Sequence, residues 1–398
     1  MFRPVDEQLS ILLRGAAQVE TEKELRAKLE RSLKTKTPLR VKYGIDPTGF
    51  DVHLGHTVPL RKMRQFQELG HTPVLLIGTA TAMVGDPSGR DSSRVGLTPE
   101  QIQKNAENYL TQISKVLDTS KAEIVRNGDW FGKWGFAEML RLLGQATVQQ
   151  MLAREDFANR FHVTKMPIQL HECLYPLMQG WDSVEIKADV ELGGTEQLFN
   201  LMVGRDLQKG AGQEPQICLT SPILRGLDGE KKMGKSLGNF IGVTEVPRDQ
   251  FGKTMSIPDT LMREWYTLLT DIPSSEVDTI LAGDPNEAKR RLAAEVVRSF
   301  NGPEAGERAL NNWITERVRG GDPDDLPEVN IPAGEVGVLD LIVAAKLTDS
   351  KGQARKKVEE GAFNYGPDRT KPADWKATVA VTNGLVLRLG KKMVRVKS

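Results

Sequence analysis

One short stretch constrains the fold of this chain more than any other. A short strand expected at 39–41, with apolar Leu39 and Val41, runs into the sequence Tyr-Gly-Ile-Asp-Pro-Thr-Gly-Phe-Asp-Val-His-Leu-Gly-His at 43–56. Its glycines and proline favour a tight turn and a close approach of the backbone. We expect a helix to about residue 69 and then an apolar strand at 74–77. Strand, helix and buried strand in this order predict a βαβ unit with a parallel sheet.

Two histidines stand at the expected start of that helix. His53 and His56 are three residues apart, so they share one helix face. A helix start offers free backbone N–H groups and the positive end of the helix dipole, which suit a phosphate. A histidine pair at this spacing is nevertheless more often structural, because short motifs match by chance. A second segment far downstream, Lys232-Met-Gly-Lys235-Ser236, is by itself compatible with a solvated basic turn.

The order of the remaining segments predicts the fold class. Residues 5–35 are expected to be helical, and Thr98 with Gln101 predicts a capping box at the start of a later helix. Expected strands near 123–126, 186–190 and 217–219 alternate with helices, which predicts a Rossmann-like, doubly wound α/β domain over residues 1–250. Strand signals then fade. We therefore expect a helical domain at 251–320, a linker at 321–336 and a small α+β domain at 337–398.

The composition is that of an ordinary globular protein, with 39% hydrophobic and 27% charged residues. The net charge is +1, so contact with nucleic acid would need a local basic patch. The tail 337–398 has such an excess, with about thirteen Lys/Arg against about six Asp/Glu. Two cysteines are too few for a disulfide framework. The sequence also lacks a His/Cys cluster of the kind that would predict a metal site. No leader-like or membrane-spanning apolar run is found, which predicts a cytoplasmic protein.

Together, the HLGH sequence at 53–56 and the KMGKS sequence at 232–236 resemble the paired HIGH and KMSKS signatures of class I aminoacyl-tRNA synthetases. Over essentially its whole length the chain resembles the bacterial tyrosyl-tRNA synthetases, and its tail resembles their S4-type RNA-binding domain. The resemblance implies a ligase that activates L-tyrosine with ATP, giving tyrosyl-adenylate and pyrophosphate, and then transfers the tyrosyl group to the 3′ end of tRNA(Tyr). It also implies Mg²⁺ with the ATP, a homodimer, and anticodon recognition by the helical domain.

The resemblance assigns roles to residues at matching positions. The residues implied in catalysis are Thr48, His53, His56, Arg90, Arg94, Lys232, Lys235 and Ser236. Those implied in nucleotide binding are Gly44, Asp46, Gly55, Gly193, Gly194, Glu196 and Met233. Those implied in tyrosine binding are Asp86, Tyr175, Gln179, Asp182 and Gln197. Arg90 and Arg94 also fit the alternative of ordinary surface arginines.

Three of the tyrosine-binding residues form a pattern of their own. Tyr175, Gln179 and Asp182 stand at i, i+4 and i+7, so on a helix they share a face. Such a polar stripe usually faces water. If it faces a pocket, Asp182 can accept a hydrogen bond from a phenol, and phenylalanine would leave that carboxylate unpaired, a discrimination already known for enzymes of this class. Lys42 stands where many relatives have a tyrosine that also contacts the substrate hydroxyl, so that second partner is unassigned.

Three alternatives stay open at this point. Tryptophanyl-tRNA synthetases share the fold, but Gln179, Asp182 and the S4-like tail favour tyrosine. An RNA-binding protein on a synthetase scaffold would have lost catalysis, whereas both signatures are intact here. Pantetheine-phosphate adenylyltransferases use a similar HxGH phosphate site, but they lack a long helical domain and a basic tail. No residue is singled out as an anticodon reader, and no ligand cluster identifies a Mg²⁺ site.

Overall fold

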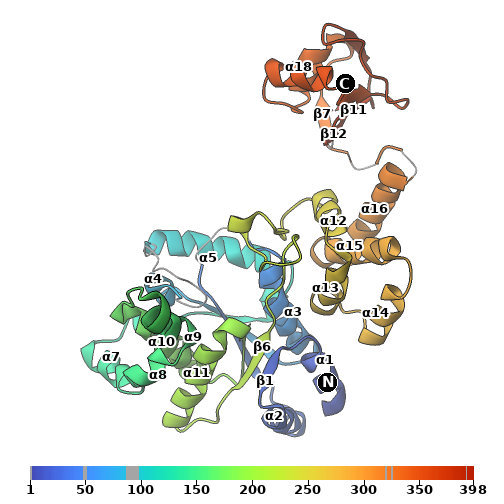
Figure 1. The fold of residues 1–398 in the computed structure, drawn as a ribbon. Coiled ribbons are helices and arrows are strands. Elements are labelled where there is room, and N and C mark those ends of the chain that lie inside the picture. The colour runs from blue at the N-terminus through green and yellow to red at the C-terminus, as the bar shows by residue number, and fades with distance from the viewer. Residues whose placement is uncertain (1, 48–51, 87–97, 319–320, 324–325, 391) are drawn as a thin grey trace. The chain divides into compact units, whose positions relative to one another are not determined.

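The computed structural model describes residues 2–47, 52–86, 98–318, 321–323, 326–390 and 392–398. The chain forms two compact units, Met1–Gly306 and Glu307–Ser398. Figure 1 shows the elements of both. Three residues implied in catalysis, Thr48, Arg90 and Arg94, lie outside the described residues. Among the helices that the structure describes, none is both long enough and apolar enough to span a membrane.

A six-stranded sheet lies at the centre of the first unit, in the order β1-β6-β5-β2-β3-β4. Neighbouring strands are parallel, except that β1 runs antiparallel to β6. The doubly wound parallel sheet predicted from the sequence is confirmed. The prediction of continuous helix over 5–35 is wrong, because β1 interrupts it and pairs with the edge strand β6. The strands are β1 Gln18–Glu20, β2 Arg40–Ile45, β3 Thr72–Ile77, β4 Glu123–Arg126, β5 Val190–Gly194 and β6 Ile217–Ser221.

Helices cover both faces of this sheet, and Figure 1 shows α10 and α11 on the opposite side from α1 and α3. Helix α3 connects β2 to β3 and packs on β2, β3, β5 and β6, whereas α11 packs on β5, β6 and α10. The predicted capping box of Thr98 and Gln101 opens α5. The helices up to this point are α1 Val5–Leu13, α2 Glu22–Thr35, α3 Leu54–Glu68, α4 Thr81–Val84, α5 Pro99–Ile113, α6 Gly128–Phe131, α7 Phe136–Leu143, α8 Val148–Leu152, α9 Glu155–Ala158, α10 Leu174–Glu185 and α11 Leu198–Gly210.

Side chains along β2 and β5 alternate between the two faces of the sheet, as strand geometry requires. Val41, Val190 and Leu192 lie in the core that α3 covers. Lys42 follows Val41 on β2, and Glu191 lies between Val190 and Leu192 on β5. Both reach the face that α10 covers, where both bond to Ser183. This alternation places two charged side chains inside the protein, beneath α10.

The helices after the sheet extend the same core. Trp265 and Tyr266 of α13 and Leu292 of α15 are fully buried and belong to the hydrophobic cluster that includes α3. Residue 250, the expected end of the α/β domain, is therefore not a boundary between compact units, since apolar packing continues across it. These helices are α12 Pro247–Met255, α13 Met262–Leu269, α14 Ser274–Leu281 and α15 Pro285–Asn301, followed by α16 Pro303–Trp313, which crosses the unit boundary.

The second unit has its own small core around Leu341, Phe363 and Leu387. Its sheets have the orders β7-β12-β11-β9 and β10-β8. The linker predicted at 321–336 is corrected here, because β7 and β8 lie in that segment and pair with β12 and β10. Backbone pairing, which composition does not report, joins these residues to the unit. The elements are β7 Glu328–Asn330, β8 Gly334–Gly337, α17 Val338–Ala344, α18 Lys351–Glu359, β9 Phe363–Tyr365, β10 Thr378–Val381, β11 Val386–Leu389 and β12 Lys392–Lys397.

Candidate functional site

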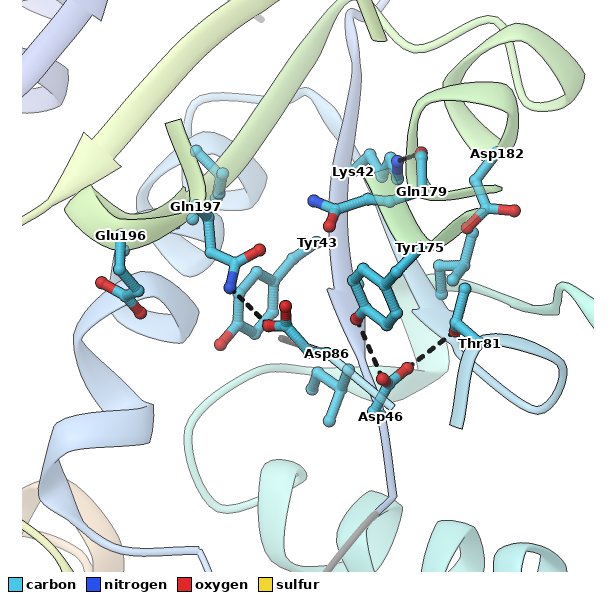
Figure 2. A pocket seen from close by; sticks show the side chains of 16 residues that line it. Lys42, Tyr43, Asp46, Thr81, Asp86, Tyr175, Gln179, Asp182, Glu196 and Gln197 are labelled. Carbon is cyan, nitrogen blue, oxygen red and sulfur yellow. Dashed lines mark hydrogen bonds between the residues drawn. The ribbon is translucent and has the colours of Figure 1, made fainter. Parts of the chain in front are cut away.

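A cavity of about 210 Å³ opens at the carboxyl ends of β2 and β5. From β2 the chain continues to β3 and β4 on one side of the sheet. From β5 it continues to β6 on the other side, so the strand order reverses between β2 and β5. Ligands of open α/β sheets bind at such a switch point. Figure 2 shows the cavity with side chains from both strands, from α10 and from the segments after β3 and β5. Its lining contains ten of the residues named from the sequence: Gly44, Asp46, Asp86, Tyr175, Gln179, Asp182, Gly193, Gly194, Glu196 and Gln197.

Asp182 is a buried carboxylate in the wall of this cavity, with 1% of the residue exposed. The indole of Trp130 donates to its Oδ1 at 3.0 Å, and Asn127 donates from Nδ2 to its Oδ2 at 3.2 Å. Burial raises the pKa of Asp182 to about 7, although the nearby positive charge of Lys42 acts in the opposite direction. The polar stripe of α10 therefore faces a cavity rather than solvent, and Asp182 still has lone pairs for a further donor.

Asp46 and Asp86 are two further carboxylates among those that line the cavity. The hydroxyl of Tyr175 donates to Asp46 Oδ2 at 2.9 Å, and Thr81 donates to the other oxygen at 2.7 Å. Gln197 donates to Asp86 Oδ2 at 2.7 Å. Figure 2 shows the Tyr175 hydroxyl turned toward Asp46. A donating hydroxyl keeps its oxygen as an acceptor, so Tyr175 and the two carboxylates make an acidic wall suited to an ammonium group.

His53 and His56 stack with ring centroids 3.8 Å apart at the start of α3. The Nδ1 atom of His53 accepts from Gly55 N at 3.1 Å, and that of His56 accepts from His53 N at 3.2 Å. An Nδ1 that accepts leaves the ring proton on Nε2, so each neutral imidazole is a donor at its far nitrogen. Burial lowers the pKa of His53 to about 3 and that of His56 to about 4. Both rings are therefore neutral donors at physiological pH.

The first backbone N–H groups of α3 are not free, which corrects the expected phosphate site. Leu54 N donates to Ile241 O at 3.0 Å, Gly55 N donates to the His53 ring, and His56 N donates to His53 O at 2.9 Å. The sequence suggested that these groups would face a ligand. Two backbone carbonyls and the His53 ring accept from them instead, so we expect donation to a ligand at this helix start to come from the imidazole rings.

The structure brings the segment at 232–236 to the imidazole pair. A Cβ built on Gly55 would lie 3.7 Å from Met233 Cβ, and the charge of Lys235 is one of the influences that lower the pKa of both imidazoles. Val243 N donates to Val52 O at 3.0 Å, which fixes the chain after this segment to the start of α3. Lys232, Lys235 and Ser236 are exposed, so two cations and a hydroxyl are presented to solvent beside the rings.

Asn239 holds this segment in place, and the sequence did not point to it. Asn239 is buried; it accepts from Gly234 N at 2.9 Å and donates to Lys232 O at 3.2 Å. Asn127 and Trp130, the partners of Asp182, were missed as well. Asn127 directly follows β4, so the rule that polar residues at strand ends meet at one edge of a parallel sheet could have found it. Trp130 carries no such signal.

No group of three or more His, Cys, Asp or Glu side chains among the described residues is arranged to hold a metal ion. Mg²⁺ is usually held by one or two carboxylates together with water and substrate phosphates, rather than by a cage of protein ligands alone. The described residues therefore do not provide a protein cage for this ion.

Comparison with known proteins agrees with this geometry. The family described as tRNA synthetases class I (W and Y) matches residues 34–316, and the tyrosine--tRNA ligase SYY-like C-terminal domain matches residues 319–394. The chain is 49% identical to the tyrosine--tRNA ligase of Symbiobacterium thermophilum, over 98% of this chain and 97% of that one. It is 47% identical to that of Moorella thermoacetica, over 98% and 95%.

Solved structures share the fold. Tyrosyl-tRNA synthetase of Archaeoglobus fulgidus, solved with L-tyrosine, superposes with a TM-score of 0.63 at 23% identity, covering 77% of this chain and 100% of that one. A C-terminally truncated mitochondrial tyrosyl-tRNA synthetase of Coccidioides posadasii gives 0.61 at 22% identity, covering 78% and 91%. Two matching family models and near-full-length similarity to the curated relatives lead to one conclusion: the chain belongs to the class I tRNA synthetases of the tryptophan and tyrosine type, and within them to the tyrosine--tRNA ligases.

Proposed function

We propose that the cavity beside β2 and β5 binds L-tyrosine with its phenol against Asp182 and its ammonium group against Asp86, Tyr175 and Gln179. The observation that carries this proposal is the buried Asp182 carboxylate, which already accepts two hydrogen bonds and keeps acceptor capacity toward the cavity. A phenol satisfies that acceptor. The phenyl ring of phenylalanine leaves it desolvated and without its third partner, which carries a free-energy penalty.

ATP lies next to the amino acid in this proposal. Its ribose contacts the turn of Gly193, Gly194 and Glu196, and its phosphates lie between the imidazole pair and the segment 232–236. Two observations support this position of the phosphates. Gly55 lies close to Met233, and the neutral rings of His53 and His56 each have a donor at Nε2. Mg²⁺ would arrive with the phosphate oxygens of ATP. No step below depends on it.

The reaction follows from this arrangement. A carboxylate oxygen of tyrosine attacks the α-phosphorus of ATP, the bond to the β-phosphate oxygen breaks, and pyrophosphate leaves with the electron pair. A ribose hydroxyl of the tRNA 3′ end then attacks the tyrosyl carbonyl and releases AMP. The first step needs positioning and donors for spreading negative charge more than it needs a base. Neutral imidazole N–H groups and the cations Lys232 and Lys235 supply those donors.

The second unit is proposed to bind the tRNA. Lys351, Arg355, Lys356 and Lys357 are exposed along α18. The guanidinium of Arg355 lies 4.5 Å from the ring centroid of Trp375, and the ammonium of Lys376 lies 5.2 Å from the same centroid. Clustered cations beside an aromatic ring suit a nucleic-acid backbone and its bases. We place anticodon contact in the helices after residue 250, and the protein in the cytoplasm, where its tRNA substrate is used.

A homodimer is proposed from exposed apolar side chains between α7 and α10. Phe136 is 80% exposed and Leu170 is 89% exposed, and further large apolar residues in this segment are exposed too. Contiguous exposed apolar surface of this kind is typical of protein interfaces. A second copy of the chain is the occupant we propose, because a homodimer is what the resemblance to the family implies. The additional residues are Leu140, Leu143, Val148, Phe161, Val163 and Met166.

ATP–pyrophosphate exchange by the purified protein tests the proposal, with each amino acid supplied in turn. Tyrosine should support exchange, and phenylalanine should support it far less. Exchange with tryptophan but not tyrosine would assign the chain to the sister specificity. No exchange with any amino acid would favour a non-catalytic RNA-binding role on the same scaffold.

A further inference from the structure

Lys42 and Glu191 form an ion pair beneath the proposed tyrosine site. They are directly paired positions on the parallel strands β2 and β5. Their side chains reach the same face of the sheet, with Lys42 Nζ 2.8 Å from Glu191 Oε1. Lys42 is 0% exposed and Glu191 is 1% exposed. A buried ion pair rarely adds stability compared with apolar residues of the same size, so its presence here suggests another role.

Every N–H bond of the Lys42 ammonium has a partner inside the protein. Nζ donates to Gln179 O at 2.7 Å and to Ser183 Oγ at 2.8 Å, and the third contact is the Glu191 carboxylate. An ammonium group has three N–H bonds, so none is left for the substrate hydroxyl. Lys42 therefore does not take the place of a second phenol partner. It bonds instead to the turn of α10 that carries Gln179 and Asp182, and Figure 2 shows it beside Gln179.

Glu191 orients the same turn from the other side. Its carboxylate accepts from Gln179 Nε2 at 3.1 Å and from the Ser183 hydroxyl at 3.1 Å, and it also accepts from Gln216 Nε2. The Gln179 amide is thereby fixed with its Oε1 toward Asn200, which donates to it at 2.9 Å. The two strands thus hold one helical turn through a saturated set of hydrogen bonds.

The charge of Lys42 also acts on Asp182. The charged and titratable groups around that carboxylate are Lys42 from β2, Glu191 from β5 and Tyr175 from two turns earlier on α10. Burial raises the pKa of Asp182, Lys42 lowers it, and Glu191 raises it. An ionised acceptor makes a stronger hydrogen bond to a phenol than a protonated one, and it is also more costly to leave unpaired.

We propose that Lys42, held by Glu191, is the positioning residue that sets the preference of this pocket for tyrosine over phenylalanine: it clamps the Gln179–Ser183 turn of α10 and places a positive charge beneath the Asp182 carboxylate. This inference rests on the proposed function of the cavity. It assigns the discrimination to a pair of residues whose charged groups bond to each other and to α10.

The test compares variants that differ in the charge of residue 42 alone. K42M keeps an unbranched side chain but leaves Glu191 without its counter-charge, so the informative pair is E191Q and K42M/E191Q. Tyrosine- and phenylalanine-dependent pyrophosphate exchange gives the ratio of the two kcat/KM values. We expect E191Q to keep the preference for tyrosine, and K42M/E191Q to lose about tenfold of it, mainly through a higher KM for tyrosine.

The pH dependence of tyrosine affinity separates charge from shape. In the unmodified protein the affinity should rise with pH as Asp182 ionises. The midpoint of that rise should move down in E191Q, where only a charge of the same sign as Asp182 is removed. It should lie about one pH unit higher in K42M/E191Q than in E191Q, because those two variants differ only in the positive charge of residue 42. The N–H resonance of the Trp130 indole, which donates to Asp182, should report the same midpoints without catalysis.

Lys62 provides a matched control, since it is a buried lysine that donates to Arg14 O at 2.9 Å and to Gln65 Oε1 at 2.7 Å, remote from the cavity lining. K62M should leave the tyrosine preference and the midpoint unchanged. Equal ratios and midpoints in E191Q and K42M/E191Q would overturn the inference while leaving the proposed function intact. If the double variant does not fold, an unmoved midpoint in E191Q would overturn it as well. Lack of tyrosine-dependent exchange by the unmodified protein would overturn the proposed function and this inference together.

Discussion

The indole of Trp130 donates a 3.0 Å hydrogen bond to the carboxylate of Asp182, across 52 positions of the chain. Trp130 belongs to the short helix after β4, and Asp182 belongs to α10. The bond turns the carboxylate so that its remaining acceptor capacity faces the cavity. A carboxylate whose protonation burial favours is thereby held in place for a hydroxyl donor.

Replacing Asp182 with asparagine should change stability in a pH-dependent way. The pKa of Asp182 in the folded protein is about 7, above the ordinary value of 3.8, so the folded state holds the proton more tightly than the unfolded state. The aspartate therefore weakens the fold progressively as the pH rises from about 4 to about 7. Relative to the unmodified chain, D182N should gain roughly 2 kcal/mol between pH 5 and pH 8. Urea unfolding at the two pH values measures this, and an equal difference at both would contradict it.

His56→Ala should slow adenylate formation while sparing tyrosine affinity. In the proposed site the ring is a neutral donor toward the charge that develops on the phosphates, and loss of one such donor costs roughly 100-fold in rate. Single-turnover adenylate formation and tyrosine titration measure the two quantities separately. Because burial lowers the pKa of His56 to about 4, its titration should add no limb to the rate profile between pH 5.5 and 8.

His71 offers a control for that substitution. It is a buried histidine whose pKa burial also lowers to about 4, and its Nδ1 accepts from Leu39 N at 3.2 Å. H71Q should affect stability but leave the chemical step nearly unchanged. Unchanged kinetics in H56A would remove His56 from the catalytic set.

Two glycines should respond in opposite ways to an added side chain. A Cβ on Gly78 would collide with the Asp46 carboxylate and the Thr81 hydroxyl, whereas a Cβ on Gly234 would meet no atom within 4 Å. G78A should displace Asp46 from Tyr175 and lower kcat/KM for tyrosine by about tenfold or more. G234S, which restores the KMSKS sequence, should stay within about threefold of the unmodified protein in the same exchange assay. A harmless G78A would show that Asp46 does not need its present position.

A chain that ends at Val318 should separate the two proposed steps. It removes residues 319–394, which match the C-terminal domain of the family, and it keeps all residues around the cavity. Pyrophosphate exchange should persist, while charging of tRNA should fall steeply because the basic α18 and Trp375 are gone. Steady-state assays of both activities measure this. Equal loss of both would mean that the second unit is structural.

An aspartate at Leu170 should weaken self-association. Leu170 is 89% exposed within the apolar segment between α7 and α10, and a charge at the centre of an apolar interface is costly to desolvate. Sedimentation velocity at several protein concentrations should show the unmodified chain as a dimer and L170D shifted toward monomer. Val246, 59% exposed and outside that segment, provides the matched variant V246D, which should sediment like the unmodified chain. Identical sedimentation of all three would place the interface elsewhere.

The sequence by itself determined the α/β class, the βαβ start and the polar stripe of α10, because these depend on local periodicity and turn chemistry. It also determined the family resemblance, through residues at 53–56 and 232–236 that keep their spacing and type. It predicted ten residues that line one cavity, although Thr48, Arg90 and Arg94 lie outside the described residues and the site roles remain predictions.

Only the tertiary structure decided how those residues are held. The first N–H groups of α3 are bonded to backbone carbonyls and to the His53 ring rather than free, and Trp130 and Asn239 entered the site without any local signal. Asn127 was marked only by its place directly after β4. The pairing of Lys42 with Glu191 depends on the register of two strands that are separated by about 150 residues, and no local pattern encodes that register. Local sequence sets which face a side chain takes, but long-range packing decides what it meets there.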